Sequence, residues 1–118
     1  MTATPPDGKI ELLRGVVTDL LRALKKGEGD KDKRRQVEDW LRTLAEKYPE
    51  FQIESGLRDY YVAEAERLRR DYDAAPDLVD RLNLGRSVES YLDKAAEYAR
   101  RAEEQSQERS QEQSTRVG

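Results

Sequence analysis

The chain has 118 residues, enough for one small domain, and its 22 basic and 25 acidic side chains leave a net charge of −3. Cysteine and histidine are both absent. Their absence excludes a disulfide scaffold, a zinc site with Cys or His ligands, and catalysis by a Ser-His-Asp triad or a Cys-His pair. A carboxylate-based magnesium site would need paired acidic motifs on facing helices, and Asp77 and Asp80, at i and i+3, have no convincing second pair. We predict a protein that is not an enzyme and needs no cofactor.

The beginning of the sequence, "MTATPPDGK", lacks the basic segment and apolar stretch of a secretory signal. No apolar run approaches the roughly 18 residues that a membrane span needs. We expect a soluble, cytoplasmic protein without a membrane partner.

Residues 1–8 are predicted to form a flexible lead, because Pro5, Pro6 and Gly8 disfavour regular structure. A helix is predicted from about residue 9 to residue 26, with Asp7 as its N-cap. Gly27 suits the left-handed residue that ends many helices, so we expect this helix to stop there.

A second helix is predicted over residues 32–48, where Pro49 stops it. Apolar residues spaced by 3 and 4 positions predict one buried face: Val37, Trp40, Leu41, Leu44, Ala45 and Tyr48. After a short connection, a third helix is predicted to begin near Ser55. Its apolar side consists of Leu57, Tyr61, Ala65, Leu68 and Tyr72.

The third helix is interrupted at "DAAPDLVD", where Pro76 fits a first-turn position and Asp77 can help to cap the next helix. Leu78, Val79 and Leu82 form a short apolar patch. Gly85 either ends a short helix or lies inside a continuous one, at a cost of about 1 kcal/mol relative to alanine.

The last helix is predicted over residues 87–105, with an inward face of Val88, Tyr91, Leu92, Ala95, Ala96, Ala99 and Ala102. Residues 106–118 are almost entirely polar and are predicted to be a disordered tail. No strand pattern is present. The prediction is an all-α fold, a small bundle of four to five short helices over residues 9–105.

The first helix raises the functional question, because its apolar residues spread over about 180° of its circumference. A helix on the outside of a small bundle needs an arc of only a little over 100°. Either this helix is central and packs against several neighbours, or its outer edge contacts another chain. That chain is a partner protein or a copy of itself.

The residues at this edge are Leu12, Val16 and Leu20, and Tyr60 on the third helix is a secondary candidate. Tyr60 and Tyr61 are adjacent and point about 100° apart, so one of them is expected near solvent. We predict a protein–protein interaction module: an adaptor, assembly factor or regulatory subunit that docks an apolar helix face.

The alternative prediction is a small helix-turn-helix DNA-binding regulator formed by residues 48–70. Arg58 and Arg67 would then contact DNA, and a basic patch at the start of the second helix would add Lys33, Arg34 and Arg35. Acidic residues interleaved with these cations would oppose phosphate binding.

The acidic segment from Asp71 to Asp80 has the composition of a calcium loop but not its pattern. Counted from Asp71, an EF-hand needs glycine where Pro76 stands and glutamate where Leu82 stands. We therefore predict no metal site.

Overall fold

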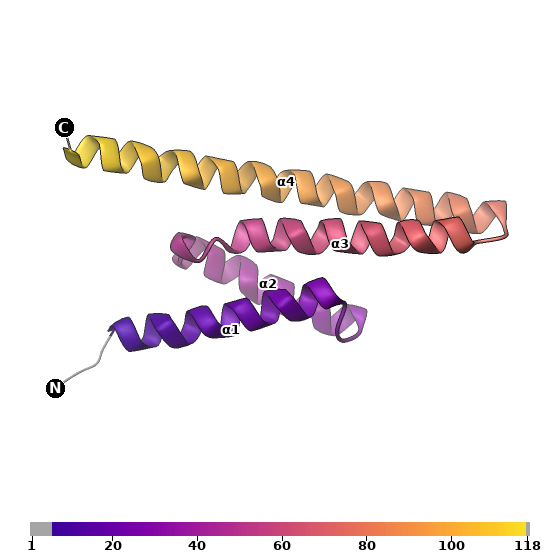
Figure 1. Cartoon of the computed structure of the whole chain (residues 1–118), viewed down its shortest axis with the longest axis horizontal. Helices are drawn as coiled ribbons and strands as arrows, with labels where there is room; N and C mark the ends of the chain where they lie inside the picture. The colour runs from indigo at the N-terminus through magenta and orange to yellow at the C-terminus, as the bar shows by residue number, and fades with distance from the viewer. Residues whose placement is uncertain (1–5, 118) are drawn as a thin grey trace. The chain divides into compact units, whose positions relative to one another are not determined.

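The computed structural model describes the backbone of residues 6–117 and the side chains of residues 8–107. Its elements are α1 (Pro6–Lys26), α2 (Lys31–Lys47), the 3-10 turn η1 (Pro49–Phe51), α3 (Ile53–Ala74) and α4 (Leu78–Val117) (Figure 1). No strand occurs among the described residues, so the predicted all-α fold is confirmed. The helices divide between Ile53 and Glu54 into two compact units.

In the first unit, α1 begins at Pro6, earlier than the sequence predicts. Proline is well suited to the first position of a helix, because its missing N–H would have no partner there. Asp7 consequently lies within the first turn, and the prediction that it is the N-cap is wrong. The rest of the predicted lead, residues 1–5, lies outside the described residues.

The end of α1 is a Schellman motif, with Gly27 in the left-handed conformation at φ 80°. The Gly27 N–H donates to the Leu24 carbonyl at 2.9 Å, and the Glu28 N–H donates to the Ala23 carbonyl at 3.0 Å. The predicted stop at Gly27 is therefore confirmed.

The start of α2 is fixed by Asp30, whose Oδ1 accepts a hydrogen bond from the Lys33 N–H at 2.8 Å. The helix ends at Lys47, just before Pro49, as predicted. Leu41, Leu44 and Ala45 are buried as predicted, whereas Trp40 is exposed, which corrects its assignment to the buried face.

In the second unit, α3 and α4 run side by side and are held together by tyrosine rings (Figure 1). The Tyr61 ring lies 5.8 Å from that of Tyr91 and 5.6 Å from that of Tyr98, centroid to centroid. The ring of Tyr60, whose centroid lies 4.8 Å from that of Tyr61, is buried as well. The expectation that one of these two neighbours lies near solvent is therefore wrong.

The α4 helix follows Asp77, whose Oδ1 accepts a hydrogen bond from the Val79 N–H at 3.1 Å. Pro76 precedes the helix and is not part of its first turn. α4 runs without interruption through Gly85 and continues to Val117. Its last turns thus enter the segment for which the sequence predicts disorder, and the side chains there lie outside the described residues from residue 108 onward.

The face that α4 buries is narrower than predicted. Ala95 and Tyr98 are buried, and Val88 and Tyr91 are half-buried. Leu92 and Ala96, which the sequence assigned to the inward face, are exposed. The reason is that α4 carries two adjacent apolar rows, and α3 covers one of them.

Candidate partner-binding surface

The first candidate surface is a row of three aliphatic residues on α1, Leu12, Val16 and Leu20, which we name the α1 outer row. Leu12 is 76% exposed and Val16 is 44% exposed, while Leu20 is half-buried. Exposure therefore falls steadily along the row. The most accessible aliphatic side chain of α1 is Leu12.

Helix geometry explains this gradient. With about 100° per residue, Val16 lies about 40° and Leu20 about 80° around the helix from Leu12. Among residues 8–26 of α1, whose side chains the structure describes, the two buried ones are Val17 and Leu24, and they lie about 120–140° from Leu12. The apolar arc is thus wider than the arc that is covered, and Leu12 and Val16 occupy the uncovered part.

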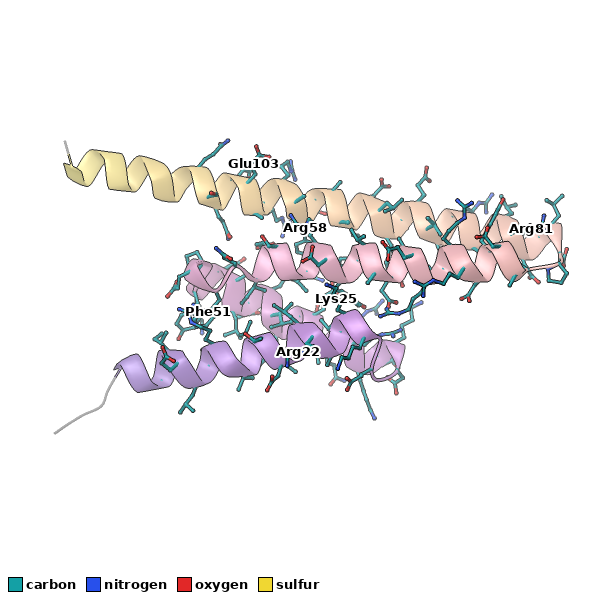
Figure 2. The ribbon with its side chains drawn as sticks, viewed as in Figure 1. Arg22, Lys25, Phe51, Arg58, Arg81 and Glu103 are labelled. Atoms are coloured by element: carbon teal, nitrogen blue, oxygen red, sulfur yellow. The ribbon has the colours of Figure 1, made fainter. Side chains whose placement is uncertain are left out.

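Charged and small side chains border the α1 outer row. Arg22, labelled on α1 in Figure 2, lies 3.7 Å from Asp19 (Nη1 to Oδ1), and both side chains are exposed. A Cβ added at Gly8 or Gly15 would meet nothing within 4 Å, so the space beside these glycines is open. The surface is an apolar strip with a charged rim, the arrangement found at protein interfaces.

Tyr60, the secondary candidate, does not belong to such a surface. Its side chain is only 4% exposed and lies against Tyr61. Because α3 buries Leu57 and Glu64 as well as Tyr61 and Ala65, its covered arc includes both tyrosines. Tyr60 is therefore buried and not available to a partner, which corrects its prediction as a partner-binding residue.

Three of the five cations of the DNA-binding alternative, Arg34, Arg58 and Arg67, have acidic or carbonyl partners close by. Arg58 Nη2 lies 2.9 Å from Asp59 Oδ1, and Arg67 forms an ion pair with Glu64 (Arg58 is labelled in Figure 2). Arg34 Nη1 donates to the Gly27 carbonyl at 3.3 Å. Lys33 and Arg35 are exposed on α2. Arg58 and Arg67 are thus engaged with carboxylates of their own helix.

A second apolar surface lies on α4, and no function was predicted for it from the sequence. Leu78, Leu82 and Leu92 are 78%, 52% and 48% exposed, respectively. An open groove of about 420 Å³ lies beside the first two, lined by Tyr72, Leu78, Arg81, Leu82, Gly85, Arg86 and Glu89. The signal was present in the sequence, because these leucines fall on one row of positions spaced alternately by 4 and 3 residues, with Gly85 and Glu89 at the positions between Leu82 and Leu92.

Within the described part of the chain, no three acidic residues are arranged so that they could hold a metal ion. Over the same residues, no helix combines the length and the apolar character that crossing a membrane requires. Comparison of the sequence and the fold with protein-family models, curated proteins and solved structures gave no match.

Proposed function

We propose that this protein is a non-catalytic interaction module, an adaptor, assembly factor or regulatory subunit, that docks a partner protein through the α1 outer row. The observation that carries the proposal is the exposure of Leu12 and Val16 on one strip of a helix whose other side is buried. Burying one such side chain completely is worth about 1.5–3 kcal/mol, so a partner that covers both gains substantial affinity.

The mechanism is helix-in-groove docking. The partner supplies an apolar groove for Leu12 and Val16, and residues at the rim of α1, such as Asp19 and Arg22, remain at the solvated edge. The glycines at positions 8 and 15 have no side chain, which allows a partner to approach the backbone of α1 closely.

The test is a tagged pull-down from the native host with three forms of the full chain: wild type, Leu12→Asp and Val62→Asp. Val62 is an exposed apolar residue on α3 and provides a matched control for a new surface charge. We expect Leu12→Asp to lose the co-purifying protein and to keep wild-type helicity in far-UV circular dichroism. Val62→Asp should retain both the co-purifying protein and wild-type helicity.

Two results would contradict the proposal. Equal recovery of the partner by wild type and Leu12→Asp would show that the α1 outer row is not the docking surface. Unfolding of Leu12→Asp would show that Leu12 belongs to the core. A parallel pull-down with nuclease distinguishes a protein partner from proteins bridged by nucleic acid.

A further inference from the structure

The α4 helix carries two adjacent rows of residues in heptad spacing. The first row contains Leu84, Val88, Tyr91, Ala95, Tyr98 and Ala102, which are buried or half-buried. The second, which we name the α4 outer seam, contains Leu78, Leu82, Gly85, Glu89, Leu92, Ala96 and Ala99. Alternating steps of 4 and 3 residues are the pattern of a coiled-coil contact, and the three leucines of the outer seam are exposed.

The groove described above occupies the first half of this seam. Leu78, Arg81, Leu82 and Gly85 line it at positions i, i+3, i+4 and i+7 of one helix. In a coiled coil, four residues of one helix form the hole that receives one side chain of the facing helix. Gly85 keeps this hole open: a Cβ there would lie 4.0 Å from Tyr72 Cε2, in ordinary contact, and a larger side chain would fill the groove.

We propose that a second copy of this chain docks antiparallel along the α4 outer seam, with Leu92 of each copy seated in the groove of the other. Leu92 is the one large aliphatic residue in the second half of the seam, which otherwise holds Ala96 and Ala99. When the two-fold axis lies at the level of Ser87, Leu92 of the second copy is level with Leu82. Ala96 of the second copy is then level with Leu78, so a small residue meets a large one.

The charges of the groove fit the same register. Arg86 and Glu89 are both exposed, and neither has an ion pair or hydrogen bond within the described structure. In this register Arg86 of each copy lies one residue, about 1.5 Å along the helix, from the level of Glu89 of the other, so the two long side chains can form two reciprocal ion pairs. A single polar residue in an otherwise apolar seam is a known means of fixing orientation and register.

A parallel arrangement fits less well. It would place Glu89 beside Glu89 of the second copy, a repulsion between like charges. It would also place Gly85 beside Gly85, so that one layer of the seam receives no side chain from either copy. The antiparallel arrangement fills the groove and neutralises the charges, and it uses a different unit of the chain from the α1 outer row.

The first test is the oligomeric state of the full chain by sedimentation equilibrium over a range of concentrations. We expect the wild type to be a dimer, and Gly85→Leu to be a monomer with a dissociation constant raised by roughly a hundredfold or more. Leucine favours helix over glycine, so this variant should keep or increase its helicity. Val62→Asp, outside the seam, is the matched control and should dimerise as the wild type does.

The second test is a charge-exchange cycle. Arg86→Glu and Glu89→Arg should each weaken the dimer about tenfold, and the two changes together should restore it. A wild type that is monomeric at every concentration, or a Gly85→Leu variant that dimerises normally, would overturn the proposal. A double exchange that fails to restore the dimer would overturn the antiparallel register. None of these results changes the expectation for Leu12→Asp in the pull-down, so the two proposals fail separately.

Discussion

At the residue scale, Leu12 and Leu24 are the same side chain on the same helix in opposite environments. Leu12 is largely exposed, whereas Leu24 is 2% exposed. We predict that Leu24→Ala lowers the free energy of unfolding by about 2–5 kcal/mol, because it removes buried methyl groups and leaves a cavity. Leu12→Ala should change it by no more than about 0.5 kcal/mol.

Urea denaturation followed by circular dichroism measures both changes. The pair is informative because the chemical change is identical and only the burial differs. A large loss of stability in Leu12→Ala would mean that the α1 outer row is covered within the folded chain. The row would then have to be assigned to the core and not to a partner.

At the element scale, the start of α2 depends on one capping residue. Asp30 Oδ1 accepts the Lys33 N–H, while Asp32, two residues later, lies in the first turn. We predict that Asp30→Ala lowers the free energy of unfolding by about 1 kcal/mol, because an N–H of the first turn loses its acceptor. Asp32→Ala, which removes only a charge near the positive end of the helix dipole, should cost about 0.3–1 kcal/mol at low salt.

Salt separates the two contributions. Added sodium chloride should shrink the effect of Asp32→Ala, since charge–dipole interactions between exposed groups are screened. The effect of Asp30→Ala should persist, because the capping hydrogen bond remains local. If Asp30→Ala and Asp32→Ala lowered the free energy of unfolding equally and with the same salt dependence, Asp30 would act only through its charge.

The ends of the elements could be predicted where one residue decides them. Gly27 and Pro49 each stop a helix through backbone conformation, and the sequence shows both directly. Gly85 could not be assigned, because its cost of about 1 kcal/mol in a helix is easily offset by packing of the residues around it. Whether α4 continues through Gly85 as one helix therefore depends on its packing against α3. The periodicity of apolar residues in the sequence does not reveal that packing.

The faces of the helices were predicted less well than their ends, for a related reason. Periodicity gives the width of an apolar arc but not the neighbour that covers it. For α1 the predicted apolar arc was wider than one flank of a bundle covers, and the sequence did not decide whether the excess was core or interface. In the structure the side that carries Leu12 is exposed. For α4 the predicted inward face included Leu92, Ala96 and Ala99 of the outer seam together with the first row, so Leu92 was misplaced. For α3 the arc was underestimated, so Tyr60 was misplaced.

At the scale of the whole molecule, the two uncovered surfaces lie in different units. The α1 outer row belongs to the first unit and the α4 outer seam to the second. A dimer formed through the seam would carry two copies of the row and could hold two partners, or one partner with two sites. Such a bivalent arrangement raises the avidity for a multimeric partner without any new contact, provided that the geometry allows both sites to bind.

The charge of the whole molecule bears on nucleic acid as a partner. Non-specific binding to DNA needs a surplus of cations facing phosphate, whereas this chain has a net charge of −3. Arg58 and Arg67, the cations that a helix-turn-helix would direct at DNA, lie against Asp59 and Glu64. A DNA phosphate would have to displace these carboxylates from the arginines, and their negative charge would repel it.

We therefore predict no measurable binding to a fluorescently labelled DNA duplex, even at low ionic strength, when anisotropy is followed during titration with the protein. The double variant Asp59→Asn, Glu64→Gln serves as a positive comparison, because it releases both arginines at nearly constant side-chain volume and raises the net charge by two units. Weak, salt-sensitive binding by this variant alone would show that the carboxylates prevent the interaction. Wild-type binding that falls steeply with added salt and is lost in Arg58→Ala would instead favour a DNA-binding regulator over an interaction module.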